Sequence, residues 1–253
     1  MLGEELIAVH ESARIVPRFS ERYPGLTPAE GYSAAGFLHS HRVSKGWRPV
    51  GRKIGFTNRT LWQRYGVHEP MWGMVYDRTL IHAKDDRATV ALAGLAQPRI
   101  EPEICFRLKS PPRSSAPDDL VEAIEWMAHS VEIVQCHHPE WKVTIADCTA
   151  DNGLHGRLIV GAPVALQDAD KLPGVEARLF RGDKLVDRGV GANVLGSPLL
   201  ALGYLVDLLE QPLAAGEIIT TGVLTDAHPV AAGEAWRTEI DGLPLRGLRI
   251  EFR

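Results

Sequence analysis

The stretch that decides the fold is residues 100–108, which read IEPEICFRL. Its even-numbered positions are apolar, and this period of two is typical of a β-strand with one face in a core. The opposite face carries Glu101 and Glu103. Residues two apart on a strand share a face at a spacing of about 7 Å. The stretch therefore predicts a strand that presents two carboxylates side by side.

A third acidic residue, Glu132, lies in the apolar run VEIV at residues 131–134. A lone carboxylate in such a run needs a partner, because burial of an unpaired charge is costly. Two interpretations of the three glutamates remain open. In the first, which spacing alone favours, the acids line a solvated edge and form weak ion pairs with basic neighbours such as Arg99, Arg107 or Lys109.

In the second interpretation, Glu101, Glu103 and Glu132 bind a divalent cation. Two carboxylates about 4 Å apart repel each other by about 4 kcal/mol at an effective dielectric constant of about 20, and a cation removes that cost. Mg²⁺ prefers about six oxygen ligands. Three glutamates would supply half of them, and a 2-oxo acid could add its keto oxygen and one carboxylate oxygen.

Length and composition describe a globular chain of 253 residues, with 45% hydrophobic residues, 24% charged residues and a formal net charge of −4. No basic block indicates a nucleic-acid partner, and no apolar run approaches the roughly 20 residues of a membrane-spanning helix. The N-terminus lacks the pattern of a signal peptide, and the three cysteines show no C-x-x-C spacing. We therefore expect a cytoplasmic protein with buried thiols.

The order of the predicted elements indicates an α+β chain, with a mostly helical part over residues 1–70 and a β-rich core over residues 71–253 in one compact unit. Thr27 and Glu30 form a T-x-x-E capping box, and Thr57 can cap a short helix. Helices are predicted over residues 3–15, 27–44, 57–66, 118–129 and 197–210, with a weaker helix or loop over 139–150. Strands are predicted over residues 50–56, 73–82, 88–92, 100–108, 130–136, 157–160 and 216–224, with hairpin turns at 182–183 and 241–242.

A family resemblance runs from about residue 50 to the C-terminus. It rests on the order and spacing of the segments GRKIGFT (51–57), RIEPEI (99–104), SVEIV (130–134), ADNG (150–153), GANVLGSP (191–198) and PLAAGEIITTG (212–222). With these segments the chain resembles the 2-keto-4-pentenoate hydratase group of the fumarylacetoacetate hydrolase superfamily. The resemblance implies a β-rich fumarylacetoacetate-hydrolase-like core and a homo-oligomer.

The same resemblance implies roles for individual residues. Glu101, Glu103 and Glu132 would be the ligands of Mg²⁺ or Mn²⁺, which favours the metal interpretation over the solvated edge. Lys53 would be a catalytic or substrate-orienting amine. Burial would lower the pKa of such an amine, whereas a nearby carboxylate cluster could reverse the sign of that shift. Without the family, a surface lysine is about as plausible at position 53.

One position departs from the family pattern. An acidic residue commonly follows the proline in the hydratases, and Met71 stands there in this chain. A proton-transfer partner for Lys53 would then be missing, or would be supplied by Glu69 or Asp77. Two polar residues of the segment around ADNG, Asp151 and His155, are further catalytic candidates, although a lone histidine is more often a structural hydrogen-bonding group.

The function that this pattern favours is a metal-dependent hydratase that adds water to an unsaturated 2-oxo acid, such as a 2-hydroxydienoate. Alternatives are a 2-oxo-enedioate decarboxylase, a C–C hydrolase of acylpyruvates, and a non-catalytic partner subunit, which Met71 makes worth considering. The glycine-rich stretch 189–196 lacks the spacing of a dinucleotide-binding loop. The His137–His138 pair lacks the spacing of a metal site, and no G-x-S-x-G motif indicates a serine hydrolase.

Overall fold

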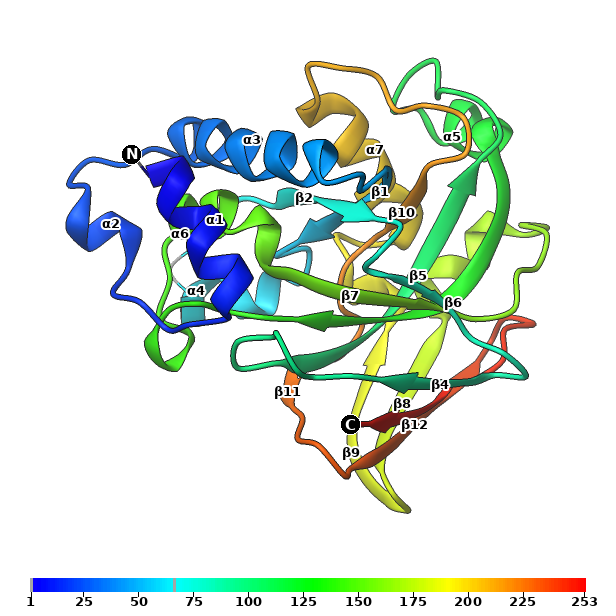
Figure 1. Ribbon diagram of the computed structural model, residues 1–253. Coiled ribbons are helices and arrows are strands. Elements are labelled where there is room, and N and C mark those ends of the chain that lie inside the picture. Colours follow the sequence, from blue (N-terminus) through cyan, green and yellow to red (C-terminus); the bar gives the residue numbers. More distant parts are fainter. Residues whose placement is uncertain (1, 66) are drawn as a thin grey trace.

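The predicted strand at residues 100–108 lies in the middle of the larger of two sheets (Figure 1). The computed structural model describes residues 2–65 and 67–253. In this part of the chain, the larger sheet runs in the order β2-β1-β10-β5-β6-β7-β3, and β11 pairs with β5 at one end. Its strands are β1 (Pro49–Gly55), β2 (Met71–Tyr76), β3 (Leu80–His82), β5 (Arg99–Leu108), β6 (Ile124–Val134), β7 (His155–Val160), β10 (Ile218–Thr220) and β11 (His228–Pro229).

A smaller sheet packs against the larger one through apolar side chains. Ile100, Val131 and Ile133 of the larger sheet share a buried cluster with Trp236 and Phe252 of the smaller one. Its order is β4-β13-β12-β8-β9, and every pair is antiparallel except β13 with β4. These strands are β4 (Arg87–Val90), β8 (Glu176–Arg181), β9 (Lys184–Val190), β12 (Ala235–Asp241) and β13 (Arg249–Phe252).

Helices from the N-terminus form a layer with a helix from the middle of the chain (Figure 1). Leu6, Phe19 and Leu38 are buried there with Ala150. The predicted capping box is present, because the Thr27 side chain accepts from Glu30 N and the Glu30 carboxylate accepts from Thr27 N. The helices are α1 (Leu2–Ser12), α2 (Phe19–Arg22), α3 (Pro28–Ser44), α4 (Trp62–Tyr65), α5 (Pro117–Ala123), α6 (Ile145–Ala150) and α7 (Pro198–Leu208). Short 3₁₀ helices lie at Arg59–Leu61, Pro139–Trp141, Asn152–Leu154, Ala169–Gly174 and Gly191–Asn193.

The helix predicted over residues 118–129 is wrong beyond its first half. Helix α5 ends at Ala123, and strand β6 begins at Ile124. From Met127 to Val134 every residue of β6 is buried, so its sequence carries no alternation to separate it from a buried helix. Pairing with β5 along almost its whole length stabilises the strand instead.

Other boundaries differ by smaller amounts. The predicted strand 73–82 is two strands, β2 and β3, and the predicted strand 216–224 is paired only at Ile218–Thr220. Asn58, not Thr57, caps the short helical segment that follows, since its side chain accepts from Thr60 N. The predicted helix end at Gly66 lies outside the described residues.

The division near residue 70 stays a prediction, but strand β1 precedes it and lies between β2 and β10 in the larger sheet. The sheet therefore takes in residues 49–55, including Lys53.

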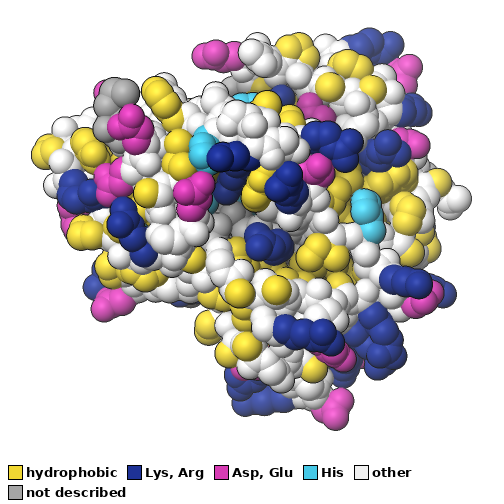
Figure 2. Space-filling model, in the orientation of Figure 1, with side chains coloured by type: hydrophobic (Ala, Val, Ile, Leu, Met, Phe, Trp, Pro, Cys, Tyr) yellow, Lys and Arg dark blue, Asp and Glu magenta, His cyan; other side chains and the backbone are white. Residues whose placement is uncertain are grey.

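The surface mixes charges of both signs. On the face in Figure 2, basic and acidic side chains are interspersed among apolar ones. Within the described residues, no helix has the length and apolar character needed to cross a membrane.

Candidate active site

The antiparallel register of β5 and β6 brings the three glutamates together. Glu101 lies directly opposite Glu132, and Glu103 lies two positions along β5 on the same face. Each carboxylate has an oxygen within 4.8 Å of an oxygen of the other two. Glu103 and Glu132 are fully buried, so the solvated-edge interpretation does not fit these two side chains.

Hydrogen bonds hold the Glu103 carboxylate in a fixed orientation. Glu103 Oε2 accepts from Gly222 N at 2.9 Å and from the Thr220 hydroxyl. Gly222 has a φ of +106°, and a Cβ at this position would lie 1.8 Å from Thr57 Oγ1. The other oxygen, Glu103 Oε1, has no hydrogen-bond partner among the described residues although it is buried. A buried carboxylate oxygen of this kind is free to bind a cation.

Electrostatics in the cluster favour a cation. Burial raises the pKa of Glu101 to about 8, and the charges of Glu132 and Asp226 add to this while Lys53 opposes it. Burial and the neighbouring Glu132 and Glu101 raise the pKa of Glu103 well above its ordinary value. These carboxylates repel one another in a buried site, so a hard divalent cation with oxygen ligands fits them.

Lys53 lies on β1 with its amine directed at the carboxylates. Its Nζ is 3.2 Å from Glu132 Oε2, and the side chain is 3% exposed. Burial by itself lowers the pKa of this amine, but the charges of Glu132, Glu101 and Glu103 outweigh burial and raise it. The sequence left the sign of this pKa shift open, and the geometry makes the amine an ammonium.

Met71 lies opposite Gly55 where β2 pairs with β1. A Cβ on Gly55 would lie 2.5 Å from Met71 Cε and 3.2 Å from Lys53 Nζ, so the thioether end and the amine are neighbours. Neither suggested substitute lies beside them. Asp77 accepts from Arg48 N and Arg48 Nε at 3.0 Å, and Glu69 is exposed and does not line the cavity next to Lys53.

His155 lies behind Glu132 rather than in the cavity. Its Nδ1 is 2.7 Å from Glu132 Oε1, and its Nε2 is 2.8 Å from the Thr79 hydroxyl. Burial lowers the pKa of His155, so the ring is neutral and Nδ1–H donates to the carboxylate. A neutral histidine held at both ring nitrogens can orient a carboxylate ligand.

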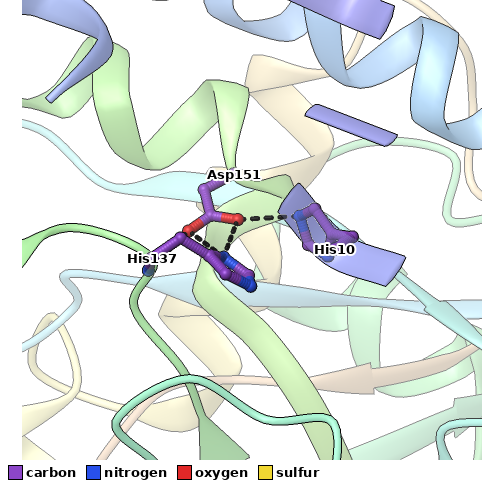
Figure 3. A group of neighbouring side chains, drawn as sticks. All are labelled: His10, His137 and Asp151. Carbon is purple, nitrogen blue, oxygen red and sulfur yellow. Dashed lines mark hydrogen bonds and ion pairs between the residues drawn. The ribbon is translucent and has the colours of Figure 1, made fainter. Parts of the chain in front are cut away.

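Asp151 belongs to a second buried cluster, with His10 and His137 (Figure 3). Its Oδ1 is 2.8 Å from His10 Nε2 and 2.8 Å from His137 Nδ1. Arg42 Nη2, which can only donate, is 3.1 Å from His10 Nδ1. His10 Nδ1 is therefore the acceptor, and the proton of the neutral ring is on Nε2, the nitrogen that faces Asp151 at 2.8 Å. Because the histidine nitrogens facing Asp151 act as donors, this cluster fits a hydrogen-bonded network better than a metal site.

The His10 network predicts a loss of stability in mild acid. Burial lowers the pKa of His10 to about 4, although Asp151 opposes this. In the unfolded chain this histidine has its ordinary pKa of about 6.5, so between about pH 6.5 and pH 4 the unfolded chain binds more protons than the folded chain. The free energy of unfolding therefore falls as the pH drops through this range. At pH 5 the expected loss is at most about 2 kcal/mol relative to pH 8. Urea unfolding of the wild type and of His10→Gln at both pH values measures it, and an equal loss in the two proteins contradicts the assignment.

A cavity opens beside the glutamates. Its polar lining includes Lys53, Glu101, Asn58 and Asp226, and the rest is largely apolar. Sequence reasoning missed Asn58 and Asp226. The only signal was proximity in the chain, since Asn58 directly follows the segment 51–57 and Asp226 comes four residues after the segment 212–222.

Named relatives match most of the length of this chain. No family model matches the chain. The 2-hydroxyhexa-2,4-dienoate hydratase of Comamonas testosteroni is 31% identical over 248 residues, which cover 95% of this chain and 93% of the relative. The 2-keto-4-pentenoate hydratase 1 of Dechloromonas aromatica (strain RCB) is 35% identical over 207 residues, which cover 79% and 77%.

Solved structures share this fold over most or all of the chain. The 4-oxalocrotonate decarboxylase from Pseudomonas putida G7, complexed with magnesium and adipate, superimposes with a TM-score of 0.92 at 26% identity and covers 100% of this chain and 96% of that chain. A fumarylpyruvate hydrolase from Pseudomonas aeruginosa, in complex with Mn²⁺ and pyruvate, has a TM-score of 0.63 at 13% identity over 81% and 89%, which shows a common fold alone. The predicted α+β class is confirmed. With relatives above 30% identity along most of its length, the chain belongs to the 2-keto-4-pentenoate hydratase family.

Proposed function

We propose that this protein is a metal-dependent hydro-lyase that adds water to a 2-hydroxydienoate, an unsaturated 2-oxo acid in its enol form. The observation that carries the proposal is the group of three convergent carboxylates beside the Lys53 ammonium, with Lys53 and Glu101 lining a largely apolar cavity. The hydratase names of the two relatives support the reaction type.

Glu101, Glu103 and Glu132 would hold Mg²⁺ or Mn²⁺. The buried Glu103 Oε1, which has no hydrogen-bond partner among the described residues, supports this ligand set. When bound, the ion would supply a Lewis acid for the 2-oxo and carboxylate oxygens of the substrate. His155 would act as a positioning residue through its hydrogen bond to Glu132.

Lys53 would carry protons. In the hydration of a 2-hydroxydienoate, the enol oxygen loses a proton and the terminal carbon C5 gains one, which gives a conjugated 2-oxo-3-enoate. Water then adds its oxygen to C4 and a proton to C3. The Lys53 ammonium, 3.2 Å from Glu132, would first give up a proton and, as the resulting neutral amine, would then take up the proton of the enol oxygen.

Asp151 would act at one remove from the chemistry. It ends α6 and directly precedes the segment Asn152–Leu154, and His10 and His137 hold its carboxylate. We propose that this network fixes the cavity wall that contains Leu154.

A homo-oligomer is also proposed, since Leu200, Tyr204 and Leu208 are exposed on α7. The free, buried cysteines support a reducing cytoplasm.

Decarboxylation of a 2-oxo-enedioate is the second candidate, because the decarboxylase from Pseudomonas putida G7 shares the whole fold. Both reactions need the same electron sink at the 2-oxo end, so the three glutamates do not distinguish hydration from decarboxylation. A decarboxylase must in addition hold a carboxylate at the far end of the substrate.

The reaction type is decided by turnover of the pure protein with Mg²⁺. We expect the dienol absorbance of a freshly generated 2-hydroxydienoate to decay with formation of the 4-hydroxy-2-oxo product. We expect no CO₂ from a 2-oxo-enedioate. CO₂ release from the enedioate, without water addition to the dienoate, contradicts the hydratase assignment and favours the decarboxylase. Turnover of neither substrate favours the non-catalytic partner subunit.

A further inference from the structure

A line of buried hydrogen bonds runs from Glu132 to the turn between β2 and β3. Glu132 Oε1 lies 2.7 Å from His155 Nδ1, and His155 Nε2 lies 2.8 Å from the Thr79 hydroxyl. All three side chains are at most 3% exposed, so these bonds are made in the protein interior. The main chain of Thr79 is held as well, because Thr79 N donates to Tyr76 O and Leu158 N donates to Thr79 O, each at 2.9 Å. The line therefore joins a carboxylate of the site to a fixed turn.

The direction of each bond follows from the donors and acceptors in reach. The Thr79 hydroxyl has one proton, and its oxygen lies 3.0 Å from Tyr76 O and 2.8 Å from His155 Nε2. Tyr76 O already accepts from Thr79 N, whereas no other donor among the described residues reaches His155 Nε2. Tyr76 N donates to the Thr79 oxygen at 3.1 Å, which leaves the hydroxyl proton for the ring. Thr79 therefore donates to Nε2, and the proton of the neutral ring lies on Nδ1, where it faces Glu132.

The two oxygens of Glu132 then have different roles. Oε1 accepts from His155 Nδ1–H, whereas Oε2 faces the Lys53 ammonium at 3.2 Å. His155 does not line the cavity, so it holds the carboxylate from the side away from the cavity. Rotation of the carboxylate would break this bond. Oε2 is therefore the oxygen that remains for a cation shared with Glu101 and Glu103.

We infer that Thr79 is a positioning residue of the metal site, which acts through His155 to hold the Glu132 carboxylate with Oε2 toward the cation. The inference rests on the proposed function for the role of Glu132 as a metal ligand. The hydrogen bond between Thr79 and His155 does not depend on that role, so the two can be tested separately.

A second buried threonine–histidine pair has the same construction but a different end point. His129 Nε2 lies 2.7 Å from the Thr238 hydroxyl, and His129 Nδ1 lies 2.9 Å from the main-chain oxygen of Glu103. The Glu103 carboxylate is oriented by other groups, the Thr220 hydroxyl and Gly222 N. Loss of the Thr238 hydroxyl should therefore lower stability without turning a ligand carboxylate. Thr238→Val is thus the matched control for Thr79→Val.

Calorimetry with Mg²⁺ alone tests the inference. Thr79→Val keeps the size of the side chain but removes the donor to Nε2, and it should weaken Mg²⁺ binding by about tenfold, the low side of what a partner of a metal ligand contributes. Thr79→Ser keeps the hydroxyl and should bind Mg²⁺ as the wild type does. Thr238→Val should unfold at a lower temperature, as Thr79→Val should, but should keep the wild-type Mg²⁺ affinity. Equal weakening in both valine variants would make the effect one of general stability and overturn the inference.

A double-mutant cycle tests the route through His155. His155→Asn keeps an N–H donor near the Nδ1 position but has no second nitrogen for Thr79. In that background, Thr79→Val should have no further effect on Mg²⁺ affinity. An additional loss of the same size as in the wild-type background would show that Thr79 acts by another route, which also overturns the inference.

A measurement without metal separates this inference from the proposed function. In the metal-free protein, the His155 Nδ1 proton should give a downfield NMR signal, which His155→Asn identifies by its absence. Thr79→Val should broaden or shift that signal, and Thr79→Ser should preserve it. These NMR results with unchanged Mg²⁺ affinity in Glu132→Gln would support Thr79 as the anchor of His155 and contradict the proposed ligand set. A wild-type signal and wild-type Mg²⁺ affinity in Thr79→Val, with loss of affinity in Glu132→Gln, would overturn the role of Thr79 and leave the proposed metal site intact.

Discussion

Glu101→Gln, Glu103→Gln and Glu132→Gln are each expected to weaken Mg²⁺ or Mn²⁺ binding by more than about 100-fold and to abolish turnover. Each substitution keeps the shape of the side chain and removes one of three charges from a buried site, where a paired charge–cation interaction contributes several kcal/mol. Glu101 and Glu132 face each other across β5 and β6. Loss of either carboxylate would therefore leave the cation with one of these two ligands.

The fold should survive these substitutions. Two carboxylates about 4 Å apart repel each other by about 4 kcal/mol at an effective dielectric constant of about 20. Removal of one negative charge therefore relieves electrostatic repulsion in the metal-free protein. Thermal unfolding of Glu101→Gln and Glu103→Gln without metal should therefore occur at the wild-type temperature or above it, whereas Glu132→Gln also breaks the buried ion pair with Lys53 and should unfold at a lower temperature. Glu125→Gln is the matched control, because Glu125 lies on β6 with Glu132 but is exposed and pairs with Arg107. Unchanged metal affinity by calorimetry in all three site variants would show that the glutamates are not ligands.

The sequence predicted the part of this site that lies on a single strand, β5. The alternation over residues 100–108 indicated β5, and with it the shared face of Glu101 and Glu103. That Glu132 lies opposite Glu101 depends on the register between β5 and β6. Register is set by pairing and packing along both strands, which spacing within one strand does not contain. The apolar run around Glu132 made it a candidate for the third ligand, and the family resemblance favoured that interpretation over surface ion pairs.

The missed features have the same physical origin. From Met127 onward β6 is buried on both faces, so its apolar residues fitted a helix as well as a strand. His10, His137 and Asp151 are far apart in the chain and meet only because the N-terminal helices pack beside the core. His155 was predicted only as a catalytic candidate, because its position behind Glu132 depends on tertiary contacts with Glu132 and Thr79.

Lys53→Met is expected to lower kcat by about 10²- to 10⁴-fold, the contribution of a positioned acid or base. Methionine keeps the length of the side chain and its apolar stem but removes the ammonium that lies 3.2 Å from Glu132. A metal ligand and a proton carrier respond differently to this change. The Lys53 ammonium repels a divalent cation at the three glutamates, so its removal should leave Mg²⁺ affinity unchanged or tighter while turnover falls.

Lys53→Arg separates proton transfer from charge. Arginine keeps the positive charge beside Glu132, but its guanidinium does not give up a proton in the working pH range. We therefore expect kcat of Lys53→Arg to stay within about tenfold of Lys53→Met, with a smaller change in KM because the charge is kept. Steady-state kinetics with a 2-hydroxydienoate measure both, and Lys109→Met, at an exposed lysine just after β5, is the control. A wild-type kcat in Lys53→Arg would make Lys53 a fixed charge that orients the substrate, and a wild-type kcat in Lys53→Met would leave it a purely structural residue.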